Sequence, residues 1–339
     1  DIITTNTFAT CRHTLQGPGV EDKTLAINQA AVKLAKQAVK NTNKENKVLI
    51  AGSMTNFFAL SENEYRPDPR FLPSLSDEEK NYKEMAKILL NEGVDILLLE
   101  MLLDIDHSKI LLNAALETGL PVWVGLSCCI SKHDQTIIGR NYGAEKTESL
   151  IYDKTKIVEN PKFLPEDKII PLVDIIDELT SIGGDVYGIM HSWFEDSKLG
   201  LEVLKDKWSG PIMFYPEIHL FDTSTGGAII TATEDEFAEN CSNLIDNRIK
   251  IIGGCCGVTD NHLKSLINKF EYFFSEDQGR YVVEVSKKNL QKVEKNKFPL
   301  VGLIKELPKN SSLFETILIT INGIYRLFRV QIKISALSK

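Results

Sequence analysis

Short apolar runs alternate along most of the chain with polar loops and with amphipathic stretches of helical period. The first run is β-branched, Asp1–Thr5, and the segment after it, Thr24–Lys40, places its apolar residues along one helical face. The same alternation of strand and helix continues to residue 252. Continuous apolar strands separated by helices predict a parallel sheet that is covered on both faces.

Seven strands and six intervening helices follow from this pattern. The strands are expected at Asp1–Thr5, Val48–Ala51, Ile96–Leu99, Val122–Leu126, Val186–Met190, Ile212–Tyr215 and Lys250–Ile252. The helices are expected at Thr24–Lys40, Ser76–Leu90, Ser108–Glu117, Val173–Ser181, Ser197–Trp208 and Glu234–Ile245. Ser76 is the expected N-cap of the second helix, with Glu79 at the capping-box position. These units predict an α/β fold, a TIM (β/α)8 barrel without its first strand and helix, and an open doubly wound sheet is the alternative.

Residues beyond 270 follow a different pattern. A lysine-rich segment covers 287–297, and apolar runs at 316–321 and 324–334 flank Asn322-Gly323, a strong signal for a type I′ hairpin. We therefore expect a barrel domain over residues 1–270 and a C-terminal extension over 271–339 that contains a linker or helix and a β-hairpin. The apolar surface of a hairpin outside a barrel must be shielded from water. We therefore expect this hairpin to pack on the barrel or on a second copy of the chain in a homo-oligomer.

Composition narrows the class of protein. Of 339 residues, 43% are apolar and 25% are charged, which is ordinary for a globular protein. The 39 basic and 47 acidic residues give a net charge of -8, so neither a nucleic-acid partner nor an anionic membrane is expected. No apolar run is long enough to span a bilayer, and no signal peptide opens the chain. The six cysteines include two adjacent pairs, which suits reduced thiols and a cytoplasmic location.

Chemically active side chains gather where the predicted strands end, which is where parallel barrels place their active sites. They include sulfur, imidazole and carboxylate groups: Thr5, Thr7, Ser53, Glu100, Ser127, Cys128, Cys129, His191, Tyr215, Glu217, Cys255 and Cys256. Catalytic zinc takes three protein ligands, and His191 with Cys255 and Cys256 supplies such a set. The pair Cys128-Cys129 is also at a strand end, but core packing is the preferred interpretation there.

Glycines surround the second cysteine pair. Adjacent residues of a strand point to opposite faces, so Cys255 and Cys256 reach one ion only where the backbone turns sharply. Gly253-Gly254 and Gly257 permit that turn. The same glycines would also suit a phosphate cradle, although two cysteines add nothing to one.

Six landmarks in colinear order resemble the zinc-dependent homocysteine S-methyltransferase family, which includes betaine-homocysteine methyltransferase. They cover about residues 1–270 and lie at Asp1–Phe8, at Ala51–Ser53 with Glu64-Tyr65 shortly after, and at Asp95–Glu100, Gly188–His191, Tyr215–Glu217 and Gly253–Gly257. The resemblance implies a TIM barrel in which Zn²⁺ binds the thiol of homocysteine. A methyl group then passes to that thiol from a cationic sulfonium or ammonium donor, such as S-methylmethionine or betaine, to give methionine.

The resemblance also implies roles for individual residues. Cys255 and Cys256 match two zinc ligands of the family, and Glu100 matches the carboxylate that receives the ammonium group of homocysteine. Thr5 and Thr7 fall where the family lines the same pocket.

Three departures from the family pattern stand out. The opening strand with its Asp-Gly-Gly motif is absent, so we expect the chain to be an N-terminally truncated fragment. His191 stands in place of the first zinc cysteine, which makes the ligand set less negative by one charge. Met190 and Glu217 replace two asparagines, and a carboxylate at 217 would favour a cationic donor. These departures keep a second interpretation open, a degenerate member that binds a small thiol, amino acid or metal without methyl transfer.

Overall fold

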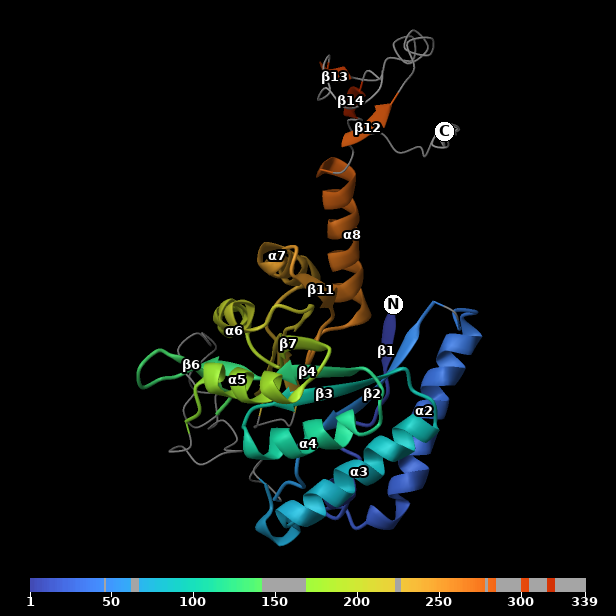
Figure 1. Ribbon diagram of the computed structural model, residues 1–339, viewed down its shortest axis with the longest axis vertical. Helices are drawn as coiled ribbons and strands as arrows, with labels where there is room; N and C mark the ends of the chain where they lie inside the picture. The colour runs from blue at the N-terminus through green and yellow to red at the C-terminus, as the bar shows by residue number, and fades with distance from the viewer. Residues whose placement is uncertain are drawn as a thin grey trace. The chain divides into compact units, whose positions relative to one another are not determined.

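A curled sheet of seven parallel strands forms the centre of residues Asp1–Leu263, the first of two units into which the chain divides (Figure 1). The computed structural model describes residues 1–45, 47–61, 67–141, 169–222, 227–277, 280–284, 300–304 and 316–320. The strands of the sheet are β1 Ile2–Thr4, β2 Leu49–Thr55, β3 Ile96–Leu102, β4 Val122–Leu126, β7 Val186–Met190, β8 Ile212–Tyr215 and β11 Ile249–Ile252. All seven predicted strands are therefore present.

The order of the strands decides between the two predicted architectures. In space they follow one another as β1-β2-β3-β4-β7-β8-β11, so each strand is added on the same side of the one before it. A doubly wound sheet reverses its order at a switch point, and this sheet has no reversal. The α/β architecture is that of a half-barrel of TIM type, which confirms the barrel prediction and rules out the doubly wound alternative. In the part of the chain that the structure describes, β1 and β11 are the two edges of the sheet.

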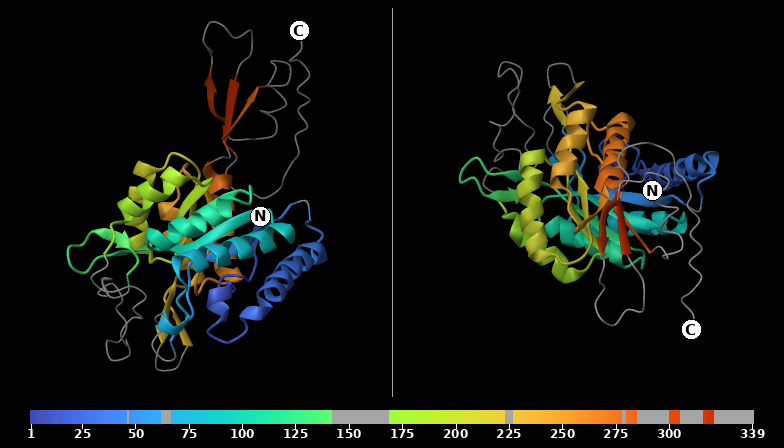
Figure 2. Two further views of the ribbon diagram at one scale, coloured as in Figure 1. Left: turned by 60° about the horizontal axis from the view of Figure 1, so that its bottom comes forward. Right: turned by 90° about the horizontal axis from the view of Figure 1, so that it is seen from above.

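Helices follow most of the strands and pack beside one another in chain order (Figure 2). Their bounds are α1 Arg12–Leu15, α2 Thr24–Asn41, α3 Leu75–Asn91, α4 Asp106–Leu116, α5 Leu172–Ile182, α6 Phe194–Lys207, α7 Glu234–Leu244 and α8 Asp260–Asp277, with short 3₁₀ turns at Glu21–Lys23 and Pro69–Phe71. In α2 the buried residues Ala31, Val32, Ala35 and Val39 recur at helical spacing, which gives the helix one apolar face. None of the described helices is long and apolar enough to cross a membrane.

Side chains of the strands are buried on both faces of the sheet, as a covered parallel sheet requires. On β3, Leu97 and Leu99 are fully buried, while Ile96 and Leu98 belong to a core cluster shared with other strands of the sheet. The alternation of a strand places Glu100 on the same face as Ile96 and Leu98. Glu100 therefore faces the side on which the strands share a core.

Helix α3 begins at Leu75, and Ser74 caps it in place of Ser76. The hydroxyl of Ser74 accepts a hydrogen bond from the backbone N–H of Asp77 at 3.2 Å. Because both serines precede the same acidic turn, the sequence alone offered two registers for the cap. The Ser76 N-cap prediction is therefore wrong by two residues.

Replacing Ser74 should destabilise the chain, whereas replacing Ser76 should not. Loss of an N-cap hydroxyl costs about 1 kcal/mol of unfolding free energy, so we expect Ser74→Ala to lower it by about that amount. Ser76→Ala lies inside the helix and is the matched control. Urea unfolding monitored by circular dichroism measures both variants, and equal losses in the two would contradict the assignment of the cap.

Two short hairpins in the loops after the strands were not predicted. β5 Cys128–Ile130 pairs with β6 Ile137–Gly139, and β9 His219–Asp222 pairs with β10 Gly227–Ile230. Strands of three or four residues within long polar loops leave almost no periodicity to read. Cys128 and Cys129 are both fully buried in β5, in keeping with the packing role preferred for them.

The second unit, Lys264–Lys339, contains an antiparallel sheet of the order β12-β14-β13. Its strands are β12 Arg280–Glu284, β13 Leu300–Ile304 and β14 Thr316–Thr320. The first strand of the predicted hairpin is present as β14, which pairs with β12 and β13. The predicted turn at Asn322-Gly323, its partner strand at 324–334 and the lysine-rich segment 287–297 lie outside the described residues.

Candidate metal centre

Two strands of the sheet, β7 and β11, bring one histidine and two cysteines to the same end of the sheet, with β8 between them. His191 follows β7 directly, and Cys255 and Cys256 lie three and four residues after the end of β11. The loop after β8 forms backbone hydrogen bonds with both cysteines. The N–H of Cys255 donates to the carbonyl of Pro216 at 2.9 Å, and the N–H of Ile218 donates to that of Cys256 at 3.0 Å.

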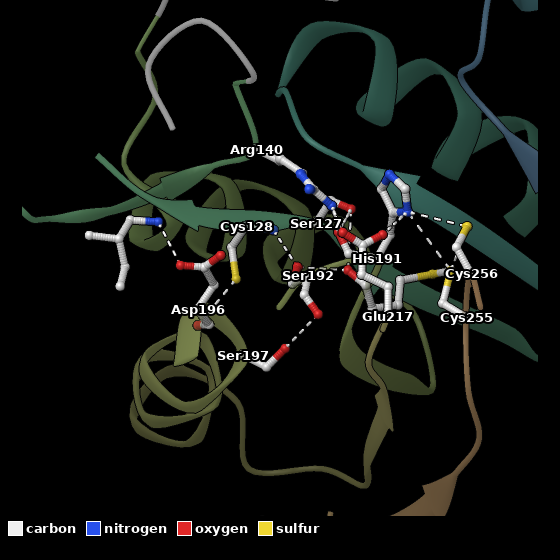
Figure 3. Close-up of polar contacts among 12 residues, drawn as sticks. Ser127, Cys128, Arg140, His191, Ser192, Asp196, Ser197, Glu217, Cys255 and Cys256 are labelled. Atoms are coloured by element: carbon white, nitrogen blue, oxygen red, sulfur yellow. Dashed lines mark hydrogen bonds and ion pairs between the residues drawn. The ribbon is translucent and has the colours of Figure 1, made fainter. Parts of the chain in front are cut away.

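The distances among the three side chains are those of a metal site (Figure 3). The two sulfur atoms are 3.8 Å apart, and the Nδ1 of His191 lies 3.8 Å from the Sγ of Cys255 and 3.9 Å from the Sγ of Cys256. In a tetrahedral zinc site, two sulfurs are separated by about 3.8 Å, and a sulfur and a nitrogen by about 3.5 Å. All three ligand atoms lie within 4.8 Å of one another. The residues present therefore fit zinc.

The turn that carries the cysteines depends on glycine at two positions. Gly257 has a φ of +85°, a left-handed conformation that glycine adopts without strain. A Cβ on Gly254 would lie 2.2 Å from a side-chain carbon of Val258. These two positions explain how adjacent residues direct both sulfurs to one point.

The two cysteines differ in protonation. The thiol of Cys255 donates a hydrogen bond to the sulfur of Cys256, and this bond raises the pKa of Cys255 and lowers that of Cys256 to about 4. The neighbouring His191 also lowers the pKa of Cys256. Both cysteines are free, with Cys255 partly buried and Cys256 exposed. The pair thus holds one thiolate ready at neutral pH, and thiolate is the form that binds metal.

The backbone of His191 is held in an unusual conformation. Its φ is +47°, in the left-handed region that residues other than glycine rarely adopt. Its carbonyl accepts hydrogen bonds from the Nη1 of Arg140 at 2.6 Å and from the hydroxyl of Ser127 at 3.2 Å. These two bonds stabilise the conformation that turns the imidazole toward the cysteines.

A buried ion pair beside the imidazole was not predicted from the sequence. The Nη1 of Arg140 lies 2.5 Å from the Oε1 of Glu217, and the two side chains are 5% and 2% exposed. The Oε2 of Glu217 lies 2.8 Å from the Nδ1 of His191. Burial favours the neutral acid, but Arg140 and His191 together outweigh it and hold the pKa of Glu217 below its ordinary value. The charge of Glu217 is already paired with that of Arg140. This carboxylate is therefore not available to attract a cationic methyl donor.

Glu100 lies close enough to His191 and Cys256 for their charges to act on it. Burial raises its pKa to about 7, the Ser53 hydroxyl and His191 oppose that rise, and the charge of Cys256 adds to it. Its side chain is partly buried, and its partner in the ladder with β2 is Thr55. Glu100 lies on the face of the sheet on which the strands share a core. Its raised pKa means that the negative charge is poorly compensated, so a partly exposed carboxylate of this kind is suited to receive a cation.

Thr5 and Thr7 are committed to hydrogen bonds within the protein. Their hydroxyl oxygens are 2.7 Å apart, and Thr7 donates to the carbonyl of Ser53 at 2.7 Å. Thr5 accepts from the backbone N–H of Ser53 at 3.1 Å. With the proton of Thr7 used in this way, the proton of Thr5 goes to Thr7, so the pair connects the end of β1 to β2. The pocket role of these two threonines stays a prediction.

The sequence profile of the homocysteine S-methyltransferase family matches residues 1–270. The chain belongs to this family. It is therefore a member of a family of methyltransferases, and the match takes in every residue of the candidate metal centre. Glu64-Tyr65, part of the resemblance noted in the sequence, lies outside the described residues.

Solved structures of homocysteine methyltransferase MmuM from Escherichia coli share the fold of this family member. The metallated form is 17% identical, with 79% of each chain covered and a TM-score of 0.53. The oxidized form is 16% identical, with the same coverage and a TM-score of 0.52. At this level of identity the likeness shows the fold alone.

A curated protein is similar over a shorter stretch. The phosphoribosylformylglycinamidine synthase subunit PurL of Pelagibacter ubique is 31% identical over 117 residues, which is 32% of this chain. The chain spans only 16% of the length of that relative.

The structure shows what Met190 and Glu217, two departures from the homocysteine S-methyltransferase pattern, contact. Met190 is buried, and its sulfur accepts a hydrogen bond from the backbone N–H of Met101 at 3.4 Å. It also fills the space in front of Gly125, where a Cβ would lie 2.3 Å from its sulfur. The thioether of Met190 thus packs against strands β3 and β4. The carboxylate of Glu217 forms ion pairs with Arg140 and His191.

Proposed function

We propose that this chain transfers a methyl group from a cationic sulfonium or ammonium donor to the thiol of homocysteine, giving methionine, with Zn²⁺ as cofactor. The observation that carries the proposal is the arrangement of His191, Cys255 and Cys256, whose ligand atoms are 3.8–3.9 Å apart at the C-terminal end of the sheet. Membership of the homocysteine S-methyltransferase family supports it.

Different residues would bind the metal, bind the substrate and line the pocket in such a reaction. His191, Cys255 and Cys256 would hold the metal and leave one position for the substrate. Bound zinc lowers the pKa of a coordinated thiol and keeps the sulfur as a thiolate nucleophile. Glu100 would receive the ammonium group of homocysteine and so fix the amino acid relative to the metal ligands. Thr5 and Thr7 would shape the wall beside it through their bonds to β2.

Homocysteine and a cationic methyl donor are the partners of this proposal. S-methylmethionine and betaine both present a methyl group on a positively charged atom. We place the protein in the cytoplasm, because the free cysteines, including the exposed Cys256, suit a reducing compartment. A homo-oligomer that covers the apolar C-terminal strands is part of the proposal and is tested by light scattering.

Methionine formation tests the proposed function. The zinc-loaded chain is incubated with homocysteine and either S-methylmethionine, betaine or a related sulfonium compound, and methionine is measured by mass spectrometry. We expect methionine with at least one cationic donor and none after zinc is removed by a chelator. Homocysteine binding without methionine from any donor would instead support a degenerate relative that binds thiols.

A further inference from the structure

We propose that Met190 is a positioning residue for Glu100, because its sulfur holds a β-bulge in β3 that directs this carboxylate toward the candidate metal centre. The inference deepens the proposed function and rests on it, since Glu100 is there the residue that receives the ammonium group of homocysteine. It gives a role to a methionine that stands where the family pattern has asparagine.

One extra residue interrupts the pairing of β3 with β4. The register shifts between Leu99 and Leu102, which stand three positions apart on β3 while their partners on β4 stand two apart. An insertion of one residue is a β-bulge, which bends the strand and redirects the side chains that lie in it. The two residues between the paired positions are Glu100 and Met101. The direction of the Glu100 side chain therefore depends on the shape of this bulge.

Met101 is the residue of the bulge with the unusual backbone. Its φ is +61°, in the left-handed region that residues other than glycine rarely adopt. In a regular strand its N–H would face β4, as does the N–H of Leu97, which donates to the carbonyl of Pro121 at 2.9 Å. The register shift removes Met101 from the pairing with β4. Its buried N–H then needs another acceptor, because leaving it without one is costly.

The sulfur of Met190 supplies that acceptor. The N–H of Met101 donates a hydrogen bond to it at 3.4 Å, and both residues are buried. Met190 is the last residue of β7, and β4 lies between β7 and β3 in the sheet. The long methionine side chain crosses β4 at Gly125, where a Cβ would collide with its sulfur. Residues of three strands thus fix the conformation of the bulge.

The hydrogen bond acts on the peptide unit that Glu100 shares with Met101. The N–H that donates to Met190 belongs to this unit, so the bond fixes the orientation of the backbone that begins at the Cα of Glu100. In this conformation the Ser53 hydroxyl and the charges of the metal-centre residues act on the Glu100 carboxylate. Met190 thereby fixes the group that would bind the ammonium end of homocysteine relative to the ligands of the metal that would bind its thiol.

The N–H of Met101 reports the bond directly. The chain contains five methionines, so ¹⁵N-methionine labelling of the zinc-loaded chain gives five backbone signals, and Met101→Leu identifies the one from residue 101. Met190→Leu nearly conserves the side-chain volume and removes the acceptor. We expect it to shift the Met101 signal and to increase the exchange of this N–H with D₂O several-fold. An unchanged Met101 signal in Met190→Leu would overturn the proposal.

Two thiols separate the positioning of Glu100 from damage to the metal centre. Homocysteine and 4-mercaptobutyrate share the thiol and the carboxylate, but only homocysteine carries an ammonium group. In calorimetric titrations of the zinc-loaded chain, we expect Met190→Leu to bind homocysteine about 10-fold more weakly, the lower end of the loss for a hydrogen bond to a charged group. Its affinity for 4-mercaptobutyrate should stay unchanged. An equal loss for both thiols would show that Met190 acts through its neighbour His191, which contradicts the proposal.

Met213→Leu is the matched control. Met213 is a buried methionine of β8 that packs over Gly188 of β7, much as Met190 packs over Gly125 of β4. This variant should leave the Met101 signal and both affinities as they are in the unaltered chain, and thermal unfolding checks that both variants are folded. The same selective loss in Met213→Leu would make the effect one of core packing, and the proposal would fail.

Gly125→Ala supplies an independent variant. It keeps Met190 in the chain but displaces its sulfur from Met101. We expect the same shift of the Met101 signal and the same selective loss of homocysteine binding as in Met190→Leu. An unaltered chain that binds neither thiol would refute the proposed function, whereas the Met101 signal would still decide whether Met190 holds the bulge.

Discussion

Replacing Cys256 with alanine is expected to remove zinc from the chain and to abolish methionine formation. The sulfur of Cys256 is one of only two thiolates in the ligand set, and it is the one whose pKa is lowered to about 4. Without it, His191 and Cys255 remain as two ligands, too few for a catalytic zinc site, which uses three. Because Cys256 is exposed, the fold should not depend on its side chain.

Cys241→Ala is the control for this prediction. Cys241 is a buried cysteine of α7 outside either group of potential ligands, so its loss should lower stability and leave zinc in place. Zinc per chain is measured by elemental analysis, and thermal unfolding checks that both variants are folded. A folded Cys256→Ala chain that keeps its zinc would show that the metal is held elsewhere.

Replacing Glu100 with glutamine is expected to weaken homocysteine binding without removing zinc. The variant keeps the shape of the side chain and loses the charge that would receive the substrate ammonium group. A hydrogen bond to a charged group contributes about 1.5–3 kcal/mol, so we expect KM to rise by roughly 10- to 150-fold. Glu202→Gln, an exposed substitution on α6, is the control and should leave KM unchanged.

The pH profile gives the same prediction a second readout. The pKa of Glu100 is raised to about 7, so the carboxylate becomes protonated as the pH falls through neutrality. A protonated Glu100 cannot pair with an ammonium group, and homocysteine binding should weaken on the acid side. The positive charge of bound zinc would move this midpoint to lower pH. In Glu100→Gln this part of the profile should disappear, and an unchanged profile would exclude Glu100 from the pocket.

Much of the sheet could be predicted because its strands are continuous apolar runs with polar ends. Val122–Leu126, Val186–Met190 and Ile212–Tyr215 begin and end as the sequence indicated. The meeting of His191 with the two cysteines also followed from position alone, since the ends of parallel strands lie at one edge. A sharp turn was expected from the glycines around Cys255 and Cys256, and Gly257 adopts the conformation that requires glycine.

The contacts that surround the candidate metal ligands left no local signal in the sequence. Arg140 and Glu217 are 77 positions apart, and neither lies in a periodic pattern that would predict their ion pair. The hairpin that delivers Arg140 has strands of only three residues. The hydrogen bonds of Thr5 and Thr7 were not predicted either, because which partner a buried hydroxyl selects depends on the packing of β1 against β2. Such choices arise from tertiary structure, which periodicity does not encode.

X-ray absorption at the zinc edge of the purified chain tests the central claim most directly. The account predicts about one zinc per chain, with two sulfur ligands at about 2.3 Å and the remaining ligands nitrogen or oxygen at about 2.0–2.2 Å. A folded chain that binds no zinc, or zinc surrounded by nitrogen and oxygen alone, would contradict the assignment of His191, Cys255 and Cys256 as its ligands.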